Sequence, residues 1–250
     1  MTVTAAPRPR ETVADTVRRL GTAQKGAQGA PAYSRFVNRS LGRLVAALAF
    51  HAGWTPNAVT AVSAAWTATG LAVLALAPPG WGTGLLASVC LAVGYALDSA
   101  DGQLARLRGG GSPAGEWLDH MVDAAKTSTL HLAVLVGLYR SEVVDRGPWL
   151  LVPLGYCVVA AVLFFGTVLN EALRERHGAV TRAQPTAGRP SVLRSLLVVP
   201  TDYGLLCWVF VLLGAPAVFL GAYCLFFAAT AVYLALACVK WFAEIGRLVR

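Results

Sequence analysis

The stretch LDSADGQLARLRGGGSPAGEWLDHMVDAAK, residues 97–126, places acidic side chains between apolar segments long enough to cross a membrane. Asp98 and Asp101 are three residues apart, and Asp119 and Asp123 are four apart. Residues at these spacings share one face of an α-helix. The glycine-rich segment between the pairs indicates a short turn that joins two antiparallel helices. We therefore predict that the two acidic pairs face each other across the groove between those helices.

Carboxylates gathered in this way require compensation, because like charges repel and ionised groups resist removal from water. Two divalent cations would balance four carboxylates. Oxygen ligands without His or Cys favour Mg²⁺ or Mn²⁺ over zinc. A pair of such ions is suited to phosphoryl transfer, because it can clamp the oxygens of a diphosphate. The predicted ligands of two Mg²⁺ or Mn²⁺ ions are Asp98, Asp101, Asp119 and Asp123.

The composition indicates an integral membrane protein. Hydrophobic residues make up 56% of the 250 residues, charged residues only 14%, and the mean hydropathy is +0.58. Soluble domains usually have about a quarter of their residues charged. We predict an all-α, polytopic membrane fold with six spans. The fifth of these spans could begin earlier in the chain, near Ser195. The six predicted spans are Asn57–Ala77, Gly84–Arg106, Ser112–Tyr139, Pro148–Leu173, Asp202–Leu213 and Ala217–Ile245.

The chain before the first span divides into two parts. Residues 1–31 have few large apolar side chains and are predicted to be a disordered cytoplasmic tail with one short helix near Glu11–Leu20. Residues 32–250 form the predicted membrane domain. It opens with YSRFVNRSLGRLVAALAFHAGW, residues 33–54, whose spacing predicts an amphipathic helix on the membrane surface. Three side chains of this helix are expected to point toward lipid headgroups: Arg35, Arg39 and Arg43.

The distribution of basic residues predicts the orientation. With six spans, most Lys and Arg residues fall on one side, while the connections on the other side carry only Arg140 and Arg146. The basic side of a membrane protein is usually cytoplasmic. We therefore predict a multi-pass protein of the cytoplasmic (inner) membrane, with both termini and the acidic residues at the cytoplasmic face. The same pattern explains the net charge of +8 through contact with anionic membrane lipids, without nucleic acid.

The acidic residues belong to a longer pattern. Asp98-x-x-Asp101-Gly102-x-x-Ala105-Arg106, followed after eight residues by Gly115-x-x-x-Asp119-x-x-x-Asp123, resembles the full signature of the CDP-alcohol phosphotransferase (CDP-alcohol phosphatidyltransferase) family. TPNAVT at residues 55–60 is similar to the PNxxT element of that family. The resemblance extends over residues 31–245 and includes the layout of six spans after a surface helix.

The resemblance implies an enzyme of phospholipid or phosphodiester biosynthesis. It would transfer a substituted phosphate group from a CDP-linked donor (CDP-diacylglycerol or a CDP-alcohol) to an alcohol acceptor, releasing CMP. By position, Asp98, Asp101 and Asp119 would bind metal, and Asp123 would bind metal and act as general base. A homodimer is also expected. The residues expected to hold the CDP part are Gly102, Ala105, Arg106 and Gly115, with Asn57 and Thr60 as further candidates.

The sequence leaves the acceptor open. SPAGEWLDHMVD, residues 112–123, is similar to a run in choline and ethanolamine phosphotransferases, whereas the segment before TPN looks more like members that use inositol- or sugar-type donors. The acceptor could be phosphorylated. Lys126, three residues after Asp123, could neutralise the acids or contact an acceptor phosphate. Three further candidates for acceptor binding are Arg182, Arg189 and Arg194.

Two other functions use acidic residues in membrane helices. Intramembrane prenyltransferases also bind diphosphates through Mg²⁺, but the spacing after Asp101 fits their two separated motifs poorly. A cation-binding transporter would place acids along its pathway, but such proteins often contain internal repeats and broken helices. No repeat is visible here, and the acids fall at the ends of two successive helices.

Overall fold

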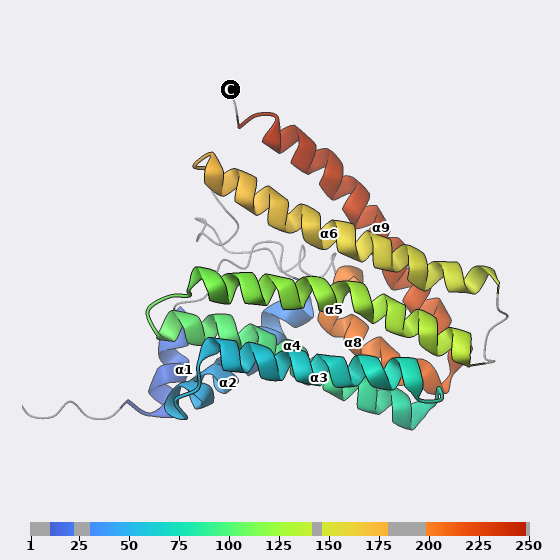
Figure 1. Ribbon diagram of the computed structural model, residues 1–250, viewed down its shortest axis with the longest axis horizontal. Helices are drawn as coiled ribbons and strands as arrows, with labels where there is room; N and C mark the ends of the chain where they lie inside the picture. The colour runs from blue at the N-terminus through green and yellow to red at the C-terminus, as the bar shows by residue number, and fades with distance from the viewer. Residues whose placement is uncertain (1–10, 23–30, 142–146, 180–198, 249–250) are drawn as a thin grey trace, which may run out of the picture.

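The computed structural model describes residues 11–22, 31–141, 147–179 and 199–248 (Figure 1). Every secondary-structure element within these ranges is helical, which confirms the predicted all-α class. Figure 1 shows the helices α3, α4 and α5 side by side, with α6 and α9 crossing above them and diverging toward their ends. The end of α4 lies beside the starts of α3 and α5 at one end of the molecule.

Five helices are long and apolar enough to cross a membrane. Proline stands at the first helical position of three of them, where its missing N–H leaves no intrahelical bond unmade. Each of the five coincides, within a few residues, with a predicted span. These helices are α3 (Pro56–Leu76), α4 (Trp81–Leu107), α5 (Pro113–Arg140), α6 (Leu151–Arg176, preceded by the 3₁₀ turn η2, Pro148–Leu150) and α9 (Pro216–Ile245).

The remaining predicted span, Asp202–Leu213, is a shorter apolar helix. It consists of α8 (Tyr203–Val209) and the 3₁₀ segment η4 (Phe210–Gly214), and it follows the short turn η3 (Val199–Thr201). The suggested earlier start near Ser195 lies outside the described residues. Asp202 caps α8, because one of its carboxylate oxygens accepts a hydrogen bond from the Gly204 N–H at 3.0 Å.

The N-terminal part contains three helical segments, namely α1 (Val13–Thr22), the π-helical turn η1 (Ser34–Asn38) and α2 (Arg39–His51). The short helix predicted near Glu11–Leu20 is thus confirmed. It packs against α2, since Leu20 is 1% exposed and the Thr16 hydroxyl lies 3.0 Å from His51 Nε2. The predicted tail therefore includes a segment that contacts the membrane domain.

The surface helix is amphipathic, as predicted. One side of η1 and α2 carries large exposed apolar side chains, whereas small residues on the other side are buried against α4. Such a helix can place its apolar side in the interfacial region of a bilayer. The exposed apolar side chains are Phe36, Val37, Leu41, Leu44 and Leu48.

Glycines allow the long helices to approach closely. A Cβ atom on Gly137 of α5 would lie 2.3 Å from the Leu74 carbonyl oxygen of α3, and one on Gly84 of α4 would lie 2.3 Å from the Phe210 carbonyl oxygen. Any larger residue would therefore push these helices apart. Small residues at helix contacts are typical of membrane proteins, where packing replaces hydrophobic burial as the force that joins helices.

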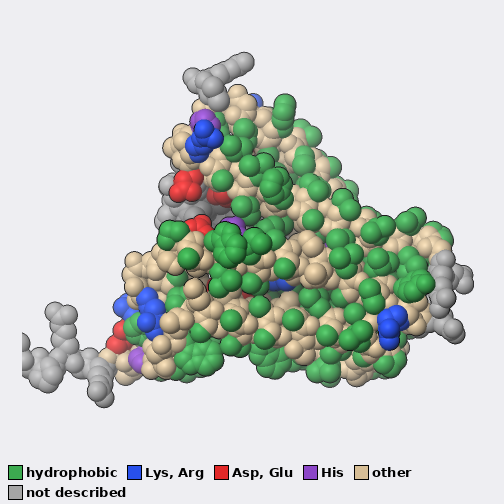
Figure 2. All heavy atoms as spheres, viewed as in Figure 1, with side chains coloured by type: hydrophobic (Ala, Val, Ile, Leu, Met, Phe, Trp, Pro, Cys, Tyr) green, Lys and Arg blue, Asp and Glu red, His purple; other side chains and the backbone are tan. Residues whose placement is uncertain are grey.

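The surface matches this arrangement. Figure 2 shows apolar side chains spread over the visible face, while charged side chains gather where α4 ends and α5 begins and near the end of α6, with further basic side chains at the opposite end. An apolar belt with charges at its rim is expected of a protein that lies in a bilayer.

Candidate active site

The two acidic helices form an antiparallel hairpin with a tight connection. Helix α4 ends at Leu107, and Gly109 and Gly110 follow with φ angles of 95° and 128°, a region that favours glycine. The Ser112 hydroxyl then accepts a hydrogen bond from the Gly115 N–H at 3.0 Å and caps α5. The glycine-rich segment thus makes the short turn predicted from the sequence.

The acidic pairs face each other across this hairpin. One carboxylate oxygen from each of Asp98, Asp119 and Asp123 can be chosen so that all three lie within 4.8 Å of one another. The fourth acid, Asp101, is 5% exposed and accepts a hydrogen bond of 2.6 Å from the Thr60 hydroxyl of α3. The predicted convergence is confirmed for three acids, while the carboxylate of the fourth is held by the neighbouring helix.

Lys126 compensates part of this charge. Its Nζ atom lies 2.7 Å from Asp98 Oδ1 and 2.5 Å from Asp123 Oδ1, and its side chain is only 10% exposed. The ion pair with Asp98 therefore joins α5 to α4, while the pair with Asp123 lies within α5. Of the two roles suggested for Lys126, the structure supports neutralisation of the acids. One ammonium cannot balance four carboxylates, so the cluster keeps an excess of negative charge.

The cluster suits divalent cations. The candidate ligands are carboxylate oxygens, and three of them lie within 4.8 Å of one another. Lys126 balances only part of their negative charge. Hard oxygen ligands of this kind are those that Mg²⁺ and Mn²⁺ prefer. Both oxygens of Asp101 already accept hydrogen bonds, one from the Thr60 hydroxyl and one from the Gly102 N–H, whereas the partly exposed carboxylates of Asp119 and Asp123 leave room for further coordination. The residues present thus fit the predicted kind of metal.

A cavity of about 520 Å³ opens beside the acids, between the ends of α3, α4 and α5. Asp101 and Asp119 are part of its wall. Two arginines, Arg106 and Arg108, also line it and bring positive charge to its wall. All six residues predicted to hold the CDP part line this one cavity: Asn57, Thr60, Gly102, Ala105, Arg106 and Gly115.

The two glycines among these six residues, Gly102 and Gly115, keep the cavity open. A Cβ on Gly102 would meet only Arg106 Nη1, at 3.8 Å, so it would project into empty space. A Cβ on Gly115 would lie 3.1 Å from Asn57 Oδ1. The Arg106 Nε atom is buried and has no hydrogen-bond partner among the described residues. A buried donor without a partner in a cavity wall is suited to receive an anionic ligand.

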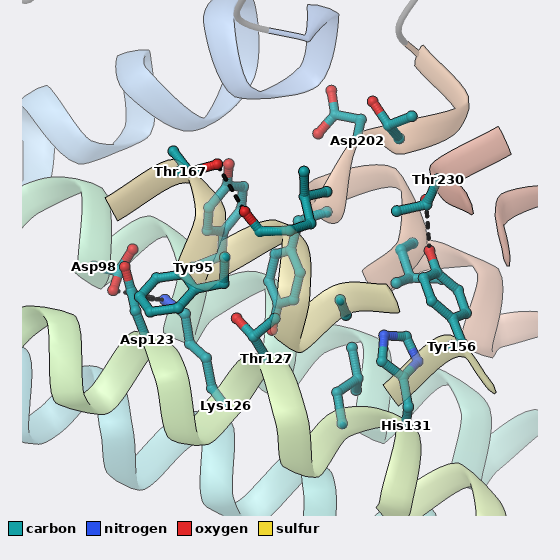
Figure 3. Close-up of a pocket in the computed structure, with 17 residues that line it drawn as sticks. Tyr95, Asp98, Asp123, Lys126, Thr127, His131, Tyr156, Thr167, Asp202 and Thr230 are labelled. Carbon is teal, nitrogen blue, oxygen red and sulfur yellow. Dashed lines mark hydrogen bonds and ion pairs between the residues drawn. The ribbon is translucent and has the colours of Figure 1, made fainter. Parts of the chain in front are cut away.

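A second cavity, of about 300 Å³, lies on the other side of the acids (Figure 3). Asp98, Asp123 and Lys126 stand at one end of it, while Tyr156 and Thr230 stand at the other. The acidic cluster therefore separates two cavities, with Asp101 and Asp119 on the first side and Asp98 and Asp123 on the second.

Sequence reasoning missed most of this second wall. Tyr95, Tyr156 and Tyr203 come from three different helices and carry no local motif, so only the tertiary fold brings them together. His131 is a buried core histidine, and its Nδ1 lies 2.7 Å from the Tyr223 hydroxyl. The loop arginines suggested for acceptor binding lie outside the described residues: Arg182, Arg189 and Arg194.

Asp202 is a further residue whose role was missed. Besides capping α8, its carboxylate accepts hydrogen bonds from the Tyr33 N–H at 2.8 Å and the Ser34 N–H at 3.3 Å. It thereby ties the start of the surface helix to the edge of the second cavity. An Asp before an apolar run predicts a helix cap. The hydrogen bonds from Tyr33 and Ser34 to Asp202 join segments far apart in the sequence, and no local pattern predicts them.

Comparison with known proteins places the chain. A family model described as CDP-alcohol phosphatidyltransferase matches residues 53–241. The phosphatidylinositol phosphate synthase PgsA1 of Mycobacterium tuberculosis, with CDP-DAG bound, is 19% identical with a TM-score of 0.55, over 84% of this chain and 94% of that one. The same synthase in complex with manganese and citrate is 20% identical with a TM-score of 0.53, over 81% and 88%.

No curated protein matches the sequence. At these identities the solved structures show a shared fold, while the family model carries the assignment. It covers most of the chain and includes every acid of the cluster, and it favours a CDP-alcohol phosphotransferase over the prenyltransferase and transporter alternatives. The chain therefore belongs to the CDP-alcohol phosphatidyltransferase family and is a CDP-alcohol phosphotransferase.

Proposed function

We propose that this enzyme binds a CDP-linked donor in the 520 Å³ cavity and passes the substituted phosphate group to an alcohol that enters from the 300 Å³ cavity. One observation carries the proposal: the acids stand where the two cavities meet. In-line displacement at phosphorus requires the attacking and leaving oxygens to lie on opposite sides of the transferred group. Two cavities separated by the acidic cluster provide those two sides.

On the donor side, Arg106 offers charge-assisted hydrogen bonds to the diphosphate, and Gly102 and Gly115 let it approach the backbone of α4 and α5. Asn57 and Thr60 of α3 close the cavity around the cytidine. PgsA1 has been solved with CDP-DAG bound, which supports a CDP-linked donor here.

We assign two divalent cations, Mg²⁺ or Mn²⁺, to the four aspartates Asp98, Asp101, Asp119 and Asp123. When bound, such ions neutralise the diphosphate and stabilise the charge that develops during displacement. The Thr60 hydroxyl fixes the orientation of Asp101. The manganese complex of PgsA1 and the convergence of three acids support this assignment.

Asp123 is the general base of the proposed reaction. It belongs to the acidic cluster and also lines the acceptor-side cavity, so its carboxylate can reach an incoming hydroxyl. It takes the hydroxyl proton while the acceptor oxygen bonds to the phosphorus of the transferred group. The bond between that phosphorus and the bridging oxygen breaks, and CMP leaves.

We further infer that the acidic end of the helices and both termini face the cytoplasm, and that the enzyme is a homodimer. The concentration of basic residues on that side supports the orientation. The orientation is tested in a variant whose five native cysteines are replaced by serine and which carries one new cysteine in residues 249–250. Labelling of that cysteine by a membrane-impermeant thiol reagent is compared between intact and opened cells. Light scattering of the purified protein tests the dimer.

The activity test uses purified protein with Mn²⁺ or Mg²⁺, a panel of CDP-linked donors and a panel of alcohols, with CMP release as the readout. Asp123→Asn should reduce CMP release by a factor of about 100 to 10,000, the usual contribution of a general base. Glu175→Gln, an acid-to-amide change at an exposed position on α6, is the matched control. Full turnover by Asp123→Asn would overturn the assignment of the base.

A further inference from the structure

The second cavity differs from the first in its charges. Among the described residues that line it, the only Lys or Arg is Lys126, and this lysine is already engaged with Asp98 and Asp123 at 2.7 and 2.5 Å. Within the described part of the wall, the one further charged residue is Asp202, whose oxygens accept backbone hydrogen bonds. The first cavity, in contrast, has two arginines in its wall.

This charge pattern is unfavourable for a phosphorylated acceptor. A phosphate monoester carries between one and two negative charges at neutral pH, and proteins hold it with Arg or Lys side chains. In the second cavity such a group would lie beside two aspartates, and the one lysine available is paired with both of them. The described wall therefore offers a phosphate more repulsion than attraction.

The body of the cavity is apolar and aromatic. The apolar side chains that line it are Leu130, Ala160, Leu163, Phe164 and Leu206, with three tyrosine rings beside them. This composition selects for an apolar ligand, because burial of such surface is favourable and a charged ligand would have to lose its water.

The polar groups deeper in the wall are neutral and largely satisfy one another. The Tyr156 hydroxyl lies 3.2 Å from Thr230 Oγ1, and the ring of Tyr156 stacks on His131 with centroids 3.7 Å apart. His131 is in turn bonded to the Tyr223 hydroxyl. These groups can accommodate a neutral oxygen of a ligand, but they provide no counter-ion for a charged one.

The cavity also extends toward the interior of the membrane. Asp123 and His131 both line it, and they are eight residues apart on α5, which corresponds to a rise of about 12 Å. A ligand with its hydroxyl at Asp123 would therefore place the rest of its body along the membrane-spanning part of α5, between α6 and α9. Water-soluble acceptors have no need of such depth.

We propose that the acceptor of this enzyme is an uncharged lipid alcohol, whose hydroxyl meets Asp123 and whose apolar body fills the 300 Å³ cavity, rather than a phosphorylated polyol. The proposal rests on the proposed function, because it names the substrate class of the same site. The acceptor oxygen bonds to the phosphorus of the transferred group, and its proton passes to Asp123. The bond from that phosphorus to the bridging oxygen breaks and CMP leaves, so no further reactant is required.

The direct test is a matrix of donors and acceptors. CDP-diacylglycerol, CDP-choline and CDP-ethanolamine are each combined with diacylglycerol, a long-chain alcohol, glycerol 3-phosphate or inositol 1-phosphate in nanodiscs containing Mn²⁺. We expect CMP release with an uncharged lipid alcohol to be at least tenfold faster than with either phosphorylated polyol. Faster release with a phosphorylated polyol overturns the proposal but leaves the proposed function intact. No release from any combination overturns both.

A binding measurement tests the cavity without relying on turnover. A diacylglycerol with a photoreactive group near its hydroxyl should label peptides of α5 and α6 that line the cavity, and Leu163→Trp, which fills it, should reduce labelling at least fivefold. Val162→Trp adds the same bulk next to it, on a side chain that is 45% exposed and lies outside the cavity wall. Labelling confined to the outer lipid-facing surface in the unsubstituted protein would contradict the proposal even if Leu163→Trp failed to fold.

Discussion

Replacement of Lys126 by methionine offers a quantitative test of how the acidic cluster is balanced. The two ion pairs, at 2.7 and 2.5 Å, involve side chains that are 10%, 15% and 27% exposed. At an effective dielectric constant of about 20, one pair at such a separation contributes about 6 kcal/mol of attraction, much of which is offset by desolvation. Breaking a buried pair by removing one partner typically costs about 3–5 kcal/mol.

The expected result is a large loss of stability in the metal-free protein. For a chain of this size, about 3–5 kcal/mol corresponds to a fall in Tm of about 10 °C. Saturating Mn²⁺ should remove most of that difference, because bound cations take over the compensation of the acids. Lys126→Met should also bind Mn²⁺ at least tenfold more tightly than the unsubstituted protein, since it lacks the cation that competes for Asp98 and Asp123.

The assay is thermal unfolding in detergent, with EDTA and with a titration of MnCl₂. Lys126→Arg keeps the charge and should lie close to the unsubstituted protein. Lys240→Met removes a 56% exposed lysine that lies 3.6 Å from Glu244, and it should change Tm by no more than a degree or two. A Lys126→Met variant that melts with the unsubstituted protein in EDTA, and whose affinity for Mn²⁺ is unchanged, would refute the reasoning.

Three further substitutions probe the donor side and the packing. Gly102→Val should raise the KM for the CDP donor at least tenfold in steady-state kinetics, because the new side chain enters the donor cavity. It should not unfold the protein, since a Cβ at this position meets only an arginine nitrogen at 3.8 Å. Gly82→Val, where a Cβ meets no atom within 4 Å, is the control. Thr60→Val removes the 2.6 Å hydrogen bond to Asp101 and should weaken Mn²⁺ binding by about 10–100-fold in calorimetry, with no change if that bond is irrelevant to the metal. Gly137→Leu should lower stability by about 1–3 kcal/mol or more, seen as early melting, because a Cβ there lies 2.3 Å from a carbonyl oxygen of α3.

Local patterns in the sequence account for the helical hairpin and the convergence of its acids. The spacings of Asp98, Asp101, Asp119 and Asp123 determine a common helix face, and the glycines between them require a tight turn. Proline stands at the start of α3, α5 and α9, and because proline is favoured at the first position of a helix, the sequence indicates where these helices begin. These features depend on residues close together in the chain, so a single sequence contains them.

Contacts between distant segments could not be predicted in the same way. The sequence placed Lys126 near Asp123, but its equal contact with Asp98 depends on the packing of α4 against α5. The wall of the second cavity combines residues from α4, α5, α6, α8 and α9, and no local pattern indicates that they meet. Likewise, the docking of α1 on α2 depends on a bond between Thr16 and His51.

The most direct test of the central claim is the location of manganese in a crystal of this protein grown with Mn²⁺. Anomalous scattering should show two ions within coordination distance of Asp98, Asp101, Asp119 and Asp123, between the two cavities. Active crystals whose anomalous peaks all lie away from these four aspartates would contradict the account.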